Sequence, residues 1–272
     1  MLNKQEIASL TPEGYPTVTR KMWRVGESKP VKLPSGATAY YLGGIENISM
    51  TIIDAEPGMS FEVKGHPEEI MIYVLEGLVV YEGGRNVRKD EAVFHCPNAS
   101  YRGKYAGVET IRLVALKVVP KPGSAPPDPA LMRKVVRLAD IVPTKLPFAT
   151  GTARRELFKT ENLSASVGEN RPVMEFLDPG HWDPECVFGL EGKLEYFDGR
   201  TVRPGDLITN GYNVPHPGRY AGLGPIVRIM ECGTSLYRVG GGSQLDGTML
   251  PGYINGWEKQ SLSQKLARPK RK

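Results

Sequence analysis

The hydrophobic positions of this chain fall in short runs that are separated by turn residues. The runs are rich in β-branched and aromatic residues, a composition typical of strands. They lie at 70–75, 78–81, 93–94, 111–119, 208–209 and 226–231. Turns such as Glu82-Gly-Gly-Arg85 occur between them, and glycine readily adopts the positive φ that tight hairpins need. This spacing predicts a β-sandwich or barrel, with short helical pieces only at 131–138 and 261–266.

An internal repeat organises the chain. Residues 66–107 align without a gap on residues 181–222 at an offset of 115, and 14 of the 42 positions are identical. A proline-rich segment lies between the copies and favours an extended linker. The sequence therefore predicts a first domain at 1–118, a linker at 119–130, a second domain at 131–237 and an extension with a basic tail at 238–272.

Charge and composition limit the classes of partner and the compartment that we expect for this protein. The formal net charge is +5, but five basic residues lie between Lys265 and Lys272, so the rest of the chain is close to neutral. A basic tail of this kind does not indicate a nucleic-acid groove. No apolar run approaches the roughly 20 residues of a membrane span. The three cysteines form no CxxC pair, and the first ten residues carry polar and charged side chains where a signal peptide needs an apolar stretch, so we expect a cytoplasmic protein without disulfides.

The second copy contains a spaced set of histidine and carboxylate residues. One motif reads Pro179-Gly180-His181-x3-Glu185-x6-Gly192, and a second reads Gly211-x-Asn213-x2-His216. With these motifs the chain resembles the cupin superfamily, and its duplication resembles a two-domain bicupin. The resemblance implies an all-β fold of two jelly-roll barrels. It also implies that His181, Glu185 and His216 are metal ligands, while Pro179 replaces the first histidine of the family's H-x-H.

The residue chemistry agrees with a metal site in the second copy. Residues four apart on a strand face the same side, so His181 and Glu185 can both point into a barrel. Two imidazoles and one carboxylate form the facial arrangement typical of non-haem Fe(II), with Mn, Zn, Ni and Co as alternatives. Tyr220 shares the parity of His216 and is a candidate hydrogen-bond donor or acid, or a core residue. Arg228 is a candidate anchor for a substrate carboxylate, or a surface ion-pair partner.

The first copy lacks this set. At the same offset Ile70 corresponds to Glu185, Tyr101 to His216, and only His66 matches His181. Glu69 is one residue out of phase, so strand alternation turns it to the opposite face. We therefore expect the first barrel to be metal-free, serving as a scaffold or binding a small ligand.

The function expected from this set is metal-dependent chemistry on a small organic molecule in the second barrel. If the ion is Fe(II), the resemblance implies a dioxygenase of a hydroxylated or enolisable carbonyl compound. The alternatives are a Mn- or Zn-dependent isomerase, lyase or hydrolase, and a non-enzymatic bicupin that binds a small ligand. A homodimer is expected, because bicupins often dimerise.

Overall fold

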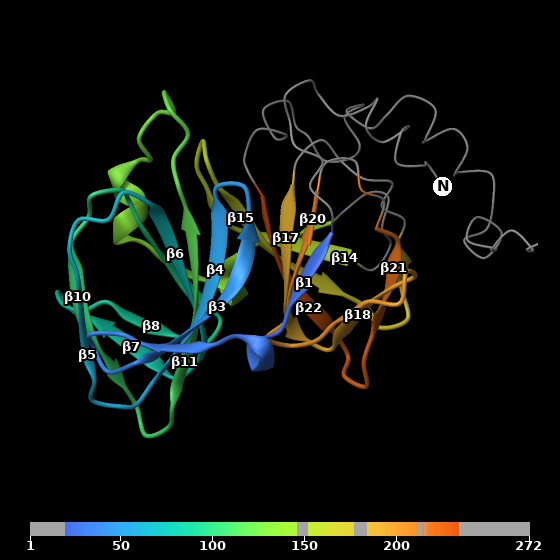
Figure 1. Cartoon of the computed structure of the whole chain (residues 1–272), viewed down its shortest axis with the longest axis horizontal. Coiled ribbons are helices and arrows are strands. Elements are labelled where there is room, and N and C mark those ends of the chain that lie inside the picture. The colour runs from blue at the N-terminus through green and yellow to red at the C-terminus, as the bar shows by residue number, and fades with distance from the viewer. Residues whose placement is uncertain (1–19, 146–151, 177–183, 212–213, 215, 234–272) are drawn as a thin grey trace, which may run out of the picture.

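The chain forms two β-barrels that lie side by side (Figure 1). The computed structural model describes residues 20–145, 152–176, 184–211, 214 and 216–233. Every strand pair among them is antiparallel, and their only helices are short 3₁₀ turns. These turns are η1 (Val25–Glu27), η2 (Pro129–Arg133) and η3 (Leu138–Asp140).

The first barrel consists of a seven-stranded sheet packed on a four-stranded one. The larger sheet runs β12 (Val135–Arg137), β9 (Glu91–His95), β6 (Glu69–Glu76), β11 (Ile111–Val118), β4 (Ile48–Ala55), β3 (Thr38–Ile45) and β2 (Pro30–Lys32). The smaller runs β5 (Ser60–Val63), β10 (Tyr101–Ala106), β7 (Leu78–Tyr81) and β8 (Asn86–Arg88). Residues that alternate along these strands face a common apolar interior.

The second barrel repeats this plan strand for strand. Its larger sheet runs β1 (Lys21–Trp23), β20 (Leu207–Asn210), β17 (Glu185–Glu191), β22 (Val227–Gly233), β15 (Ser164–Asn170), β14 (Thr152–Lys159) and β13 (Thr144–Lys145). Its smaller sheet runs β16 (Glu175–Phe176), β21 (Gly218–Ala221), β18 (Lys193–Tyr196) and β19 (Thr201–Val202). Ile70 pairs with His95 in the first barrel, and Glu185 pairs with Asn210 in the second, so the repeat preserves register at the offset of 115.

The two barrels exchange edge strands. β1 precedes the whole first barrel in the chain but pairs with β20 of the second, and Figure 1 shows this blue strand beside the orange β20. β12 follows the linker but pairs with β9 of the first barrel. Each exchanged strand occupies the same edge position in its sheet. The prediction of a helix at 131–138 is wrong over its second half, where residues 135–137 form a strand that pairs with the edge of β9. The other predicted helix, at 261–266, lies outside the described residues.

The outer faces of the two seven-stranded sheets form one shared hydrophobic core. Met50, Phe94 and Leu116 from the first barrel belong to the same buried cluster as Phe188 and Met230 from the second. Polar groups also cross this contact. Glu69 is fully buried and accepts hydrogen bonds from Thr160 Oγ1 at 2.6 Å and Asn162 Nδ2 at 2.7 Å. Glu69 therefore faces away from its own barrel, as strand alternation predicts.

Equivalent glycines close the same turn in both barrels. Gly77 and Gly192 end the repeated Leu-Glu-Gly and have φ of 84° and 70°. A Cβ at Gly77 would lie 2.7 Å from Ile111 Cγ1, and one at Gly192 would lie 2.8 Å from Val227 Cγ2. Both the backbone conformation and the close approach of the neighbouring strand therefore require glycine. None of the helices in the described part of the chain has the length and apolar character needed to cross a membrane.

Candidate metal centre in the C-terminal barrel

The structure brings Glu185 and His216 together. Glu185 is the first residue of β17, and His216 lies two residues before β21 begins. Glu185 Oε1 and His216 Nε2 are 3.0 Å apart, and the two side chains are only 14% and 4% exposed. A carboxylate oxygen and an imidazole nitrogen thus meet where both side chains are shielded from bulk water.

The backbone fixes which nitrogen of His216 faces the carboxylate. His216 Nδ1 lies 2.7 Å from the carbonyl oxygen of Val214. A carbonyl oxygen only accepts, so Nδ1 carries a proton, and Nε2 is the nitrogen that faces the carboxylate. The same arrangement orients metal-binding histidines in general.

These two donor atoms fit one divalent ion. Metal–ligand bonds of about 2.1 Å at a right angle separate two donors by about 3.0 Å, which is the separation of Glu185 Oε1 from His216 Nε2. Without an ion, two electron pairs would face each other unless His216 were protonated. The predicted third ligand, His181, lies outside the described residues, and those residues contain no cluster of three or more His, Cys, Asp or Glu side chains.

Two residues that the sequence analysis missed support the pair. Asn210, fully buried in β20, donates from Nδ2 to Glu185 Oε1 at 2.7 Å. Its Oδ1 accepts from Arg20 Nε at 2.8 Å, and the Arg20 side chain is 5% exposed. Arg20 also pairs with Asp198. The carboxylate is therefore held by an amide that is itself held by a buried guanidinium.

An aromatic residue completes this environment. The Arg20 guanidinium lies over the ring of Tyr196, 4.6 Å from its centroid, in a cation–π contact. The Tyr196 ring is 6.3 Å from that of His216. Burial, and then the charge of Glu185, raise the pKa of the Tyr196 hydroxyl far above its ordinary value. Tyr196 therefore remains a protonated hydrogen-bond donor throughout the physiological range.

Tyr220, which the sequence offers as a hydrogen-bond donor or a core residue, packs against another aromatic ring. Tyr220 is 6% exposed in the barrel interior, where its ring centroid lies 5.0 Å from that of Phe176. The first barrel repeats this contact between Phe61 and Tyr105, also at 5.0 Å, as expected of a packing pair.

Arg228 lies at the far end of β22 from Glu185. Glu185 pairs with Gly233, five residues further along that strand, which places Arg228 about 16 Å away. Its guanidinium is 3.3 Å from Asp90 of the first barrel, 3.6 Å from Glu191 and 3.7 Å from Glu169. The structure thus does not bring Arg228 to the Glu185 and His216 pair.

The fold is that of a bicupin, which confirms the fold that the resemblance implies. No protein-family model matches the sequence, and no curated protein matches it significantly. Solved structures do match over most of the chain, at identities so low that they show the fold alone.

Three of these structures illustrate the likeness. A putative glyoxylate-induced protein from Pseudomonas aeruginosa matches with a TM-score of 0.67 and 16% identity, over 81% of this chain and 92% of that one. Oxalate decarboxylase from Lactobacillus farciminis, solved as a formate complex, matches with a TM-score of 0.61 and 11% identity, over 80% and 87%. Protein YlbA from E. coli matches with a TM-score of 0.61 and 12% identity, over 84% and 96%. The bicupin fold of this chain is therefore shared with an enzyme.

Proposed function

We propose that the chain is a metal-dependent enzyme whose C-terminal barrel binds a divalent ion and a small oxygenated substrate. One observation carries the proposal: Glu185 Oε1 and His216 Nε2 lie 3.0 Å apart, both side chains are largely buried, and a contact of Nδ1 with the Val214 carbonyl oxygen orients Nε2 toward the carboxylate. His181 is the third ligand in this proposal, on the grounds of its spacing from Glu185.

A bound ion would supply a Lewis acid with open positions for two substrate oxygens. The residues of the chain provide the rest. Asn210 holds Glu185 in one orientation, and Arg20 holds Asn210. The apolar interior, which includes Val187, Ile208 and Ile229, limits water at the reacting centre.

The substrate class in this proposal is a hydroxylated or enolisable carbonyl compound, because such a compound offers two oxygens that chelate an ion. Arg20 acts on the site through Asn210, since its own charge is paired with Asp198. The ring of Tyr196 lies 6.3 Å from that of His216 and forms part of the wall beside the pair.

We assign Fe(II) as the preferred ion and oxygenation as the reaction, because two histidines and one carboxylate suit non-haem iron. The test is anaerobic reconstitution of the whole protein with Fe(II), followed by oxygen-electrode measurements with a panel of α-hydroxy ketones and β-diketones. Substrate-dependent oxygen uptake that Glu185→Gln abolishes is the expected result. No uptake with any chelating compound would reject the oxygenase.

A second candidate is a lyase that acts without oxygen. The observation that favours it is the structural likeness to oxalate decarboxylase, an enzyme of a small dicarboxylate. The same protein loaded with Mn²⁺ would then release carbon dioxide from oxalate or a related acid. Because both candidates need Glu185, the ion that supports turnover and the presence or absence of oxygen uptake distinguish them.

A further inference from the structure

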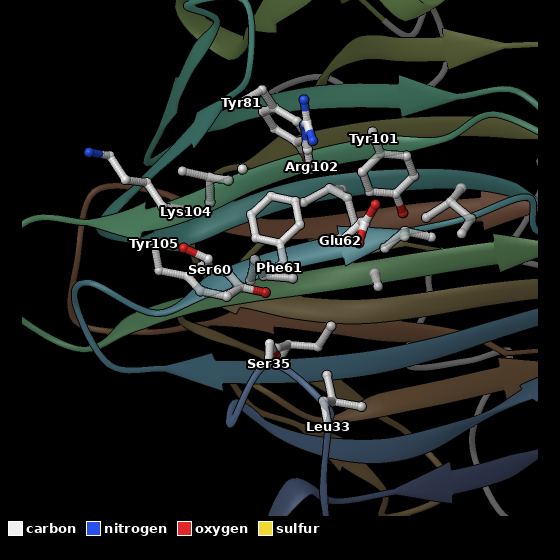
Figure 2. Close-up of a pocket in the computed structure, with 18 of the residues that line it drawn as sticks. Leu33, Ser35, Ser60, Phe61, Glu62, Tyr81, Tyr101, Arg102, Lys104 and Tyr105 are labelled. Carbon is white, nitrogen blue, oxygen red and sulfur yellow. The ribbon is translucent and has the colours of Figure 1, made fainter.

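The first barrel contains a large cavity that opens to the surface. Its volume is about 920 Å³, near the upper end of the range of roughly 300–1,000 Å³ that small-molecule sites occupy. Figure 2 shows the ring of Phe61 among those of Tyr81, Tyr101 and Tyr105. Their centroids lie 5.6, 6.4 and 5.0 Å from that of Phe61. Aliphatic side chains of the sheet, including Ile70 and Ile72, line the rest of the interior.

Side chains that do not suit a metal ion occupy the positions of the candidate metal ligands of the second barrel. Ile70 stands at the position of Glu185, and Tyr101 at that of His216. His95, at the position of Asn210, stacks on Tyr101 with centroids 3.6 Å apart and planes inclined by 13°. Burial lowers the pKa of His95 to about 3, so its ring is uncharged. This end of the cavity therefore carries aromatic and aliphatic side chains, with Lys117 beside Ile70 on the neighbouring strand.

Nε2 of His66 is an unpaired polar atom of the cavity lining. His66 is 9% exposed, and its Nδ1 lies 2.7 Å from the carbonyl oxygen of Glu68. Because that oxygen only accepts, Nδ1 holds a proton, and Nε2 of the neutral ring carries a lone pair. Nε2 is buried and accepts no hydrogen bond from any described residue, so a donor on a ligand would satisfy it.

The charged residues around the cavity lie apart from its aromatic rings. Arg102 pairs with Glu82, and Glu62 pairs with Lys64 at 3.3 Å. Lys104 and Lys117 also line the cavity, so a polar group of a ligand can lie toward these cations while its ring lies among the aromatic side chains.

We propose that the first barrel binds a small aromatic molecule that carries a hydroxyl or N–H group. Its ring lies against Phe61 and Tyr101, and its polar hydrogen is donated to His66 Nε2. Aromatic surfaces favour stacked or edge-to-face contacts with such a ring. This site is separate from the metal centre and does not depend on it.

The test uses 2-naphthol as the probe and 2-methoxynaphthalene as the control compound. The control has the same two rings but cannot donate a hydrogen bond. Titration calorimetry on the whole protein is expected to give saturable binding of 2-naphthol with about one site per chain. The methoxy compound is expected to bind about tenfold more weakly, since it leaves His66 Nε2 unsatisfied. His66→Phe is expected to abolish this difference.

Two further variants locate the site. Ala115→Phe places a ring in the cavity, where Ala115 lies in the wall, and is expected to remove binding of both compounds. Glu185→Ala alters the second barrel only and is expected to leave both affinities unchanged. In the unaltered protein, imidazole ¹⁵N spectra are expected to show a shift of His66 Nε2 on addition of 2-naphthol, which covers the case in which a variant fails to fold. Absence of binding, equal affinities for the two compounds, or binding that survives in Ala115→Phe would overturn the proposal.

Discussion

Asn210 connects the candidate metal ligand Glu185 to the buried Arg20, so its replacement tests how the site is organised. Asn210→Leu keeps most of the side-chain volume, so that water does not enter, and removes both polar atoms. The variant loses the 2.7 Å bond to Glu185 and the 2.8 Å bond from Arg20. Each is a hydrogen bond to a charged group, worth about 1.5–3 kcal/mol.

The loss is smaller than the sum of these two bonds because both charged partners keep other contacts. Arg20 retains Asp198 and the Tyr196 ring, and Glu185 retains His216. We therefore expect the free energy of unfolding of the metal-free protein to fall by about 2–4 kcal/mol, measured by urea denaturation. The affinity for Mn²⁺ or anaerobic Fe²⁺ is expected to fall about 10–100-fold, as for other residues that orient metal ligands.

A matched control lies next to it in the same strand. Thr209 faces the opposite side of β20, where its hydroxyl lies 3.4 Å from the Lys21 carbonyl oxygen. Thr209→Val is expected to leave metal affinity unchanged in titration calorimetry. Unchanged affinity in Asn210→Leu, or an equal loss in Thr209→Val, would refute the account of this network.

Three further predictions concern the rest of the fold. Asn162→Ala removes a donor from the fully buried Glu69 and is expected to lower the free energy of unfolding in urea by about 2–4 kcal/mol. A loss below about 1 kcal/mol would show that the hydrogen bond between Asn162 and Glu69 does not stabilise the contact between the barrels. His95 has a folded-state pKa of about 3 against roughly 6.5 when unfolded, so the unfolded chain binds the extra proton and stability falls as pH drops from about 6.5 toward 3. His95→Asn is expected to flatten this dependence in denaturation measured from pH 7 to 4, and identical slopes would contradict it. Arg228→Met is expected to lower the free energy of unfolding by about 1–2 kcal/mol and to change metal affinity less than twofold. A tenfold loss of affinity would show that Arg228 contributes to the metal site.

The repeat accounts for most of what the sequence could predict. Because the two copies are aligned at one offset, a strand predicted in one copy also predicts the equivalent strand in the other. The pairing of Ile70 with His95 accordingly matches the pairing of Glu185 with Asn210. Strand alternation also placed Glu69 correctly, since it depends only on neighbouring residues.

Features that depend on distant segments were not predictable. Arg20 reaches Asn210 across 190 positions, because β1 joins the second barrel rather than the first. No spacing or motif marks such an exchange. The surroundings of Arg228 likewise depend on Asp90 in the other barrel, 138 positions away. Such contacts depend on how the sheets of the two barrels pack against each other, which local sequence patterns do not show.

The most direct test of the central claim is the metal stoichiometry of the untagged protein. Metal-free protein is reconstituted with Fe(II) under anaerobic conditions, freed of unbound ion and measured by mass spectrometry beside Glu185→Gln and Thr209→Val. The account predicts about one ion per chain in the unaltered protein and in Thr209→Val, and almost none in Glu185→Gln, whose amide removes the charged donor. An unaltered protein that retains no divalent ion, or a Glu185→Gln variant that retains it fully, would contradict the assignment of the second barrel as a metal centre.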